Sequence, residues 1–223
     1  MKKKRKKKRR LKIFILIIFL MAVGSIILFL SKFSVRGYYI VGNTYYSDSE
    51  ILKKTGLDKY PSFIMTNSYG VSNIFKNDNL IKNIKIKKHL SGIFDVIVNE
   101  NKILFYDAIA KKSVLEDGKT SDIYYELSPV LINQIDNKKI YNKFIKKFKK
   151  LDENIIKNIS EIKYYPNEID KERFLISMND GNYVYVTLSK FLNINNYLEI
   201  SDTLGDKNGI LYLDYGNYFV PKE

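Results

Sequence analysis

The hydrophobic pattern divides the chain into one long apolar run and a series of short alternating segments. Residues 13–30 form a run of 18 residues without a charge. At ~1.5 Å rise per residue a helix of this length spans about 27 Å, which is close to the hydrocarbon thickness of a bilayer. Ten of the first twelve residues are Lys or Arg. The pattern predicts a basic tail at residues 1–12 followed by a transmembrane helix at residues 13–30.

The charge asymmetry around this run predicts its orientation. The positive-inside rule places the basic tail in the cytoplasm, because only Lys32 and Arg36 lie close to the other end. The alternative is a cleaved signal peptide, but the run is longer than the usual apolar core of about 7–15 residues, and residues 31–34 offer no small-x-small cleavage site. We therefore expect an uncleaved single-pass anchor of type II, with the main domain outside the cytoplasm.

The segment after the anchor, residues 34–100, alternates in a way that predicts a small α+β domain. Ser47 and Glu50 form a capping-box pattern, which marks the start of a helix that stops at Gly56. Apolar residues then alternate with lysines and polar residues in two runs separated by Ser91-Gly92, as in a hairpin with one buried face. The predicted elements are a strand at 34–41, helices at 47–55 and 71–79, and strands at 81–90 and 93–100.

The order and residues of this segment resemble the POTRA domain of the bacterial cell-division FtsQ/DivIB family. The family's opening apolar-x-apolar-x-Gly-Asn pattern occurs at residues 38–43, its Ser-x-x-Glu-Ile helix start at 47–51, and its hairpin pattern at 81–90 and 96–100. Three positions depart from the family pattern: Ser91 replaces Pro, and Lys88 and Asn101 each replace Arg. The pattern of buried positions is kept, and the resemblance implies a POTRA domain at residues 34–102.

Residues 103–220 predict a second domain of mixed elements. An Asp-Gly turn at 179–182 joins two β-rich runs, which is a strong hairpin signal. The amphipathic stretch at 137–151 carries many lysines, and we interpret these as a solvated helix face, with a patch for an anionic polymer as the alternative. The predicted elements are a turn at 116–119, an extended segment at 127–131, helices at 137–151 and 189–203, a hairpin at 174–178 and 183–188, and late strands at 210–215 and 218–220.

Residue types that carry catalysis or bind metals are scarce in the sequence. The chain has no Cys and one His, His89, so neither a cysteine zinc site nor a Ser-His-Asp triad is indicated. We interpret Asp117, Asp180 and Asp214 as turn or strand-edge residues. A glycosidase with two carboxylates stays open, because sequence alone does not pair acidic residues in space. The sequence therefore predicts a protein that is not an enzyme and has no catalytic residues, metal or cofactor.

The net charge of +14 does not indicate nucleic-acid binding. Removing the ten basic residues of the tail from the 38 Lys and Arg leaves 28 against 24 Asp and Glu, or about +4. The tail is explained by membrane topology and by contact with anionic lipids. We therefore expect no nucleic acid and no small-molecule substrate among the partners.

The family resemblance implies a fold class and a function. The fold is expected to be α+β: a transmembrane helix, a β-α-α-β-β POTRA domain, then a mixed α/β domain (the β domain, residues 103–220) with C-terminal sheet strands and a short tail at 221–223. The function implied is a non-enzymatic divisome scaffold at the division septum, which binds FtsB (DivIC in Gram-positive bacteria) and FtsL and helps regulate septal peptidoglycan synthesis. The partner-binding residues expected are Leu213, Tyr215, Tyr218 and Phe219.

Two readings compete with this function. One is a POTRA-like envelope protein with another protein-binding role, and the other is a membrane-anchored cell-wall enzyme. A docking role of the POTRA surface for further envelope proteins is a second hypothesis beside the main function. A free edge strand is the physical feature that would favour partner binding, because its unpaired backbone groups can accept another strand.

Overall fold

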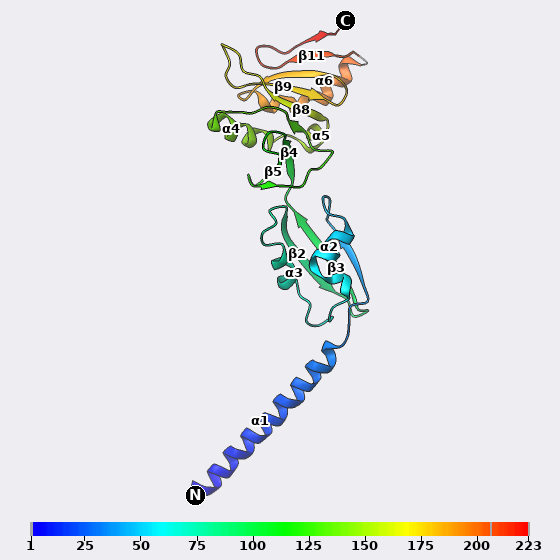
Figure 1. Cartoon of the computed structure of the whole chain (residues 1–223), viewed down its shortest axis with the longest axis vertical. Helices are drawn as coiled ribbons and strands as arrows, with labels where there is room; N and C mark the ends of the chain where they lie inside the picture. The colour runs from blue at the N-terminus through cyan, green and yellow to red at the C-terminus, as the bar shows by residue number, and fades with distance from the viewer. Residues whose placement is uncertain (1, 206, 223) are drawn as a thin grey trace. The chain divides into compact units, whose positions relative to one another are not determined.

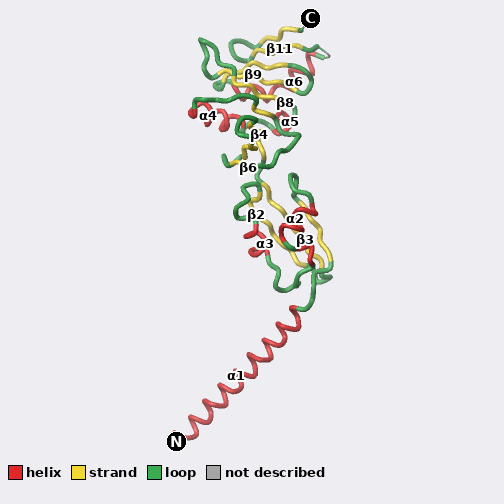
Figure 2. Tube along the Cα trace, in the orientation of Figure 1, coloured by secondary structure: helices red, strands yellow, loops and turns green. Residues whose placement is uncertain are grey.

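The computed structural model describes residues 2–205 and 207–222, without the side chains of residues 2–11, 30 and 31. Contacts divide the chain into two compact units, Met1–Asn77 with Ile81–Glu100 and Asp78–Leu80 with Asn101–Glu223. Met1 and Glu223, the outermost residues of the two predicted tails, lie outside the described residues. Each unit combines helices with its own sheet (Figures 1 and 2), so the expected α+β class is confirmed.

The first unit begins with helix α1, Lys2–Ser31. Its segment Lys12–Phe29 has a mean hydropathy of 2.8 and is not buried by the rest of the chain. By length and composition it is the one helix among the described residues that is able to cross a membrane. The helix includes the backbone of the basic tail, because it starts at Lys2.

The rest of the first unit is a three-stranded sheet with two α-helices. The order of the strands is β1-β3-β2, with β1 parallel and β2 antiparallel to β3. Phe94, Val96 and Val98 alternate along β3 and are buried, which confirms the predicted hairpin face. The elements after α1 are β1 (Gly37–Val41), α2 (Asp48–Thr55), the 3-10 helix η1 (Leu57–Lys59), α3 (Ser68–Ile74), β2 (Ile81–Lys88) and β3 (Ile93–Glu100).

The two α-helices of this sheet differ in how well the sequence predicts them. Both bonds of the capping box between Ser47 and Glu50 are present, and Gly56 ends α2 in the left-handed region at φ 69°. The second helix was predicted at 71–79, but α3 runs from Ser68 to Ile74. The prediction was wrong because Asn67 caps this helix, accepting a hydrogen bond from the N–H of Gly70 at 2.8 Å.

The second unit contains a nine-stranded sheet in the order β12-β11-β10-β9-β8-β7-β4-β5-β6. Strand β11 joins β10 in parallel, and β12 returns antiparallel to β11. The elements are β4 (Ile103–Asp107), β5 (Lys112–Leu115), β6 (Thr120–Ser121), β7 (Val130–Leu131), α4 (Lys138–Phe148), α5 (Glu153–Lys157), β8 (Ile159–Tyr164), β9 (Arg173–Met178), β10 (Tyr183–Thr187), η2 (Phe191–Asn196), α6 (Tyr197–Leu204), β11 (Gly209–Tyr212) and β12 (Tyr218–Pro221).

An aromatic cluster forms the centre of the core between α4 and the sheet. Phe144 stacks on Phe174 at 4.9 Å between ring centroids and also contacts Phe105 and Phe191. All four side chains are fully buried. The predicted amphipathic helix and the β9–β10 hairpin are therefore confirmed, and Phe144 and Phe174 join their apolar faces.

Three predicted elements of this unit need correction. The helix predicted at 189–203 begins as the 3-10 helix η2 and becomes α-helical only at Tyr197, and no side-chain hydrogen bond caps the start of either helix. The strand predicted at 210–215 ends at Tyr212. Of the extended segment 127–131, only Val130–Leu131 pairs in the sheet.

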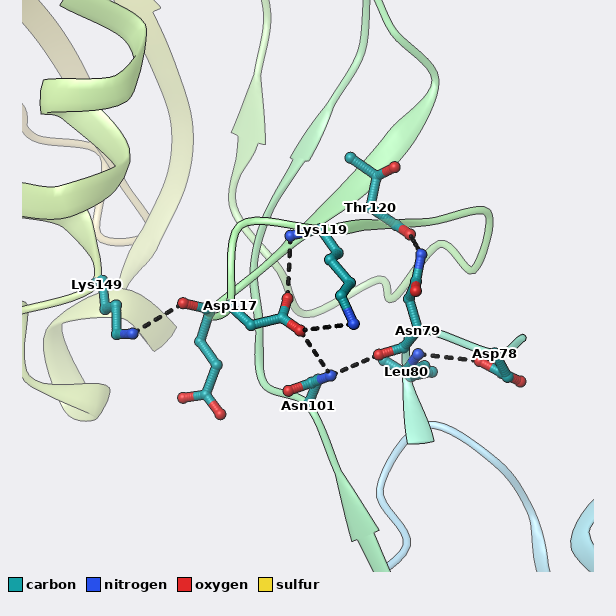
Figure 3. A network of polar contacts seen from close by, with 9 residues as sticks. Asp78, Asn79, Leu80, Asn101, Asp117, Lys119, Thr120 and Lys149 are labelled. Atoms are coloured by element: carbon teal, nitrogen blue, oxygen red, sulfur yellow. Dashed lines mark hydrogen bonds and ion pairs between the residues drawn. The ribbon is translucent and has the colours of Figure 1, made fainter. Parts of the chain in front are cut away.

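The short segment Asp78–Leu80 and Asn101, both of which belong to the second unit, are held by hydrogen bonds at residues 117–120 (Figure 3). Asn79 donates to the carbonyl of Thr120 at 2.9 Å, while buried Asn101 donates to the carbonyl of Asn79 and to the carboxylate of Asp117. Asp117 also pairs with Lys119 and accepts its backbone N–H, as expected of a turn residue. Residues 79 and 101 are thus held by hydrogen bonds inside the second unit.

Candidate functional site

The edge strand β12 offers backbone groups for pairing. It is the terminal strand of the sheet order, and no described strand pairs with its outer side. Lys222 donates its N–H to Asn208 on the β11 side at 2.8 Å, so Val220 and Tyr218, two and four residues earlier, also face β11. The N–H and C=O of Phe219 therefore point away from the sheet. Pro221 has no N–H, which limits how far pairing can extend.

One face of this edge carries a row of tyrosines, which we call the tyrosine ladder: Tyr165, Tyr185, Tyr212 and Tyr218. Successive ring centroids lie 5.9, 5.2 and 4.6 Å apart. Tyr185, Tyr212 and Tyr218 are neighbours on adjacent strands, which brings their rings together by register alone. The exposed fraction is 41% for Tyr165 and 51% for Tyr218, so both ends of the ladder are open to solvent.

A buried ion pair supports the middle of the ladder. The guanidinium of Arg173 lies 3.7 Å from the ring centroid of Tyr185, and its Nε donates to Asp214 Oδ2 at 2.7 Å. The side chains of Arg173 and Asp214 are 11% and 1% exposed. Burial raises the pKa of Tyr185, although the charge of Arg173 opposes this shift. The middle of the ladder thus lies against a cation that is held in place by its ion pair with Asp214.

The other face of the edge is hollowed. A cavity of about 360 Å³ lies between η2 and α6 on one side and the last two strands on the other. Its apolar wall includes Leu211 and Leu213, which are buried, and Phe219, which is partly exposed. The residues that line it are Asn193, Asn196, Ile200, Leu211, Leu213, Asn217, Tyr218 and Phe219.

A polar cluster behind the edge fixes where β11 begins. Buried Asn182 accepts the N–H of Gly209 at 2.7 Å, and Asp180 accepts the hydroxyl of Tyr197 at 2.5 Å. Burial raises the pKa of Tyr197, and its hydrogen bond to Asp180 adds to this. For Asp180 burial acts to raise the pKa, but hydrogen bonds from Tyr197 and Asn182 outweigh it, so the pKa is lowered. Asp180 is therefore both a turn residue and an acceptor for α6.

The four expected partner-binding residues lie in different surroundings. Leu213 is 2% exposed and donates its N–H to the carbonyl of Tyr185, so it belongs to the core. Tyr218 stacks in the ladder and also borders the cavity, whereas Phe219 borders the cavity but has no place in the ladder. Tyr215 is 57% exposed in the turn between β11 and β12. The structure thus brings Tyr215, Tyr218 and Phe219 to one sheet edge but not onto one face.

Sequence reasoning missed Arg173, Tyr165 and Tyr185 as parts of a site, and it did not include Tyr212 among the expected partner-binding residues. The alternation of tyrosine and valine in β10 was a usable signal for Tyr185. Asp214 was interpreted as a turn or strand-edge residue; it is 5% exposed and pairs with Arg173, 41 residues away. Metal-binding geometry gives no candidate, since the described residues hold no group of three or more His, Cys, Asp or Glu able to bind a metal ion.

Comparison with known proteins identifies relatives of this chain. The chain is 30% identical to the cell division protein DivIB of Listeria monocytogenes, over 98% of this chain and 85% of that protein. It is 26% identical to the cell division protein DivIB of Bacillus subtilis, over 92% of this chain and 81% of that protein. No family model matches the chain.

A solved structure is also similar in part. It is the major extracytoplasmic domain of the trans isomer of the cell division protein DivIB from Geobacillus stearothermophilus, at 22% identity and a TM-score of 0.39. The match covers 48% of this chain and 95% of that one.

An apolar helix followed by two sheet-containing units defines a two-unit α+β protein, with one candidate membrane span in the part of the chain that the structure describes. Its relatives over most of its length are bacterial cell division proteins. The chain belongs to the DivIB family of cell division proteins.

Proposed function

We propose that this protein is a non-enzymatic scaffold of the bacterial division machinery, which binds another membrane-anchored division protein at strand β12. The expected partners are the FtsB/DivIC-like and FtsL-like proteins, and the expected consequence is control of septal peptidoglycan synthesis. In this proposal α1 is an uncleaved anchor with its N-terminus in the cytoplasm, and both units lie outside the membrane at the septum. Membership of the DivIB family supports the division role.

The free edge of β12 is the observation that carries the proposal. An extended partner segment would pair with the outward N–H and C=O of Phe219, in the mode of strand addition to a sheet. Side chains of an added strand alternate between faces, so one set would meet the tyrosine ladder and the other the face of the cavity. Backbone pairing would supply affinity and the two faces would supply specificity.

The exposed tyrosines are the expected energetic centres of the interface. Tyr218 ends the ladder and Tyr215 projects from the adjacent turn, and both keep about half of their surface open. Aromatic hot-spot residues typically cost about 2 kcal/mol or more on truncation, which corresponds to roughly a 30-fold loss of affinity. Leu213 would act by supporting the strand, since it is buried.

A pair of substitutions at one position tests the backbone pairing. Phe219→Ala removes the ring but keeps the outward N–H, whereas Phe219→Pro removes both while leaving the inward-facing groups of Val220 in place. The dissociation constant is measured for the full chain in nanodiscs with the partner's outer domain. We expect Phe219→Pro to bind more weakly than Phe219→Ala, at equal helix and sheet content by circular dichroism. Equal affinities would refute strand addition at this edge.

A second comparison tests the aromatic contacts. Tyr215→Ala and Tyr218→Ala should each weaken binding by roughly 30-fold if these side chains are hot spots. Tyr124→Ala is the matched control, because Tyr124 is 53% exposed and lies outside this edge. A residue whose truncation leaves the dissociation constant at the control value is not a partner-binding residue.

A further inference from the structure

A cluster of exposed apolar side chains lies at the end of the first sheet where β1 begins. We call it the basal patch: Phe33, Ile64, Met65 and Leu90. Their exposed fractions are 51%, 41%, 68% and 106%. They come from three segments that are distant in sequence, the linker after α1, the loop before α3 and the turn between β2 and β3. Exposed apolar clusters of this kind mark surfaces that meet another molecule or a membrane.

Backbone hydrogen bonds hold the three segments together. Phe63 donates to the carbonyl of Phe33 at 2.7 Å, and Val35 donates to that of Pro61 at 3.0 Å. Arg36 donates to the carbonyl of Gly92 at 2.8 Å, which ties the β2–β3 turn to the linker. A cavity of about 330 Å³ between them is lined by Phe33, Ser34, Arg36, Phe63, Ile64, Leu90, Ser91 and Gly92. The patch is therefore a fixed surface of this unit.

The distance along the chain fixes the level of this patch relative to a membrane. The apolar segment of α1 ends at Phe29, and Phe33 follows only four residues later. Four residues span about 6 Å when helical and at most about 14 Å when extended. The polar layer on each side of a bilayer is roughly 5–8 Å thick. If α1 crosses the membrane, Phe33 and the loops bonded to it lie at the headgroups.

The charges around the patch fit an anionic surface. Arg36 is exposed and forms no ion pair among the described residues, and the same holds for Lys32. Lys88 donates to the carbonyls of Phe63 and Ile64 at 2.7 and 3.0 Å and lies over the ring of Phe63. Burial lowers the pKa of Lys88. Two free cations beside apolar tips form the combination that binds lipid interfaces.

We propose that the basal patch inserts into the interface of the membrane that α1 spans, with Arg36 and Lys32 bound to anionic headgroup phosphates. The inference rests on the membrane-spanning role of α1 and is independent of partner binding at β12. Leu90 and Met65 enter the boundary between headgroups and acyl chains, together with Phe33, which follows the apolar segment of α1 by four residues. The lipid surface thus anchors the first unit at a second place beside the helix.

Single cysteines test the insertion, because the chain has no cysteine of its own. Leu90→Cys, Met21→Cys and Val41→Cys are each labelled with a small fluorophore in the full chain, reconstituted without any other protein into vesicles of phosphatidylglycerol and phosphatidylcholine. Quenching is then measured with lipids brominated near the headgroup for Leu90 and Val41, and with lipids brominated near the end of the acyl chain for Met21, which lies in the middle of the apolar segment. Met21 reports on the anchor, and exposed Val41, about 16 Å along β1 from Arg36, is the control on the same sheet.

We expect loss of fluorescence at Leu90 and at Met21 but not at Val41, and a smaller loss at Leu90 in the Arg36→Gln background or in pure phosphatidylcholine. Quenching at Met21 alone would overturn the patch while leaving the anchor intact. No quenching at Met21 would overturn both. Quenching at all three positions would overturn the oriented insertion, since the whole unit would then lie on the membrane.

Discussion

Removal of the Asp214 carboxylate should destabilise the second unit more than any exposed ion pair could. Asp214→Ala would leave the guanidinium of Arg173, 11% exposed, without its charge partner at 2.7 Å. Breaking one side of a buried pair costs about 3–5 kcal/mol, and continued stacking of Arg173 on Tyr185 favours the lower end of that range. With a urea slope of about 2 kcal/mol/M, the unfolding midpoint should fall by roughly 1.5 M.

Two further variants isolate the cause. Asp214→Asn keeps an acceptor for the backbone N–H of Tyr215, which now donates to Asp214 Oδ1 at 3.0 Å, but removes the charge. The double variant Arg173→Met with Asp214→Leu removes both charges, and its free energy of unfolding should lie within about 1 kcal/mol of that of the parent protein. The reason is that the attraction within a buried ion pair is largely offset by the cost of removing both charges from water. A loss below about 1 kcal/mol for Asp214→Ala would refute the reasoning, since that is the range of solvent-exposed pairs.

Three other outcomes follow from the described contacts. Ser47→Ala removes the cap of α2 and should cost about 1 kcal/mol in urea unfolding, with the capping partner Glu50 left in place. Phe144→Ala empties the centre of the aromatic cluster and should cost about 3–5 kcal/mol; a loss below 1 kcal/mol would contradict its full burial. Because the pKa of Asp180 is lowered and that of Tyr197 is raised, their contributions to stability should fade as the pH drops below about 4 and as it rises above about 10, respectively. Urea midpoints measured across this range should lose both dependences in an Asp180→Asn, Tyr197→Phe double variant.

Local signals in the sequence were sufficient for elements whose determinants lie within a few residues. Three such signals involve only residues that are close in the sequence: the capping box at Ser47, the glycine at position 56 and the Asp-Gly turn of the β9–β10 hairpin. The same logic failed at α3, where Asn67 is an equally good cap but stands before a segment with little helical periodicity. The start of α6 was also missed, because no side-chain cap marks it.

The candidate site was predicted only in part, because it depends on contacts between distant segments. Tyr218 and Phe219 could be placed on a late strand, but the turn of Tyr218 toward the ladder and of Phe219 toward the cavity depends on register with β11. The pairing of Arg173 with Asp214 joins β9 to the residues after β11. The sequence around either residue contains no pattern that predicts its partner. Charge, register and burial become visible together only in the folded sheet.

The parallel pairing of β11 with β10 also imposes an order in time. Tyr183 pairs with Ile210, so residues 188–208 must close as one loop before the last two strands can join the sheet. Contacts between residues that are far apart in the sequence form late in folding, and strands at the edge of a sheet open most readily. A ligand that requires β12 would bind only the fraction of molecules in which this edge is closed, and its apparent affinity would fall in proportion.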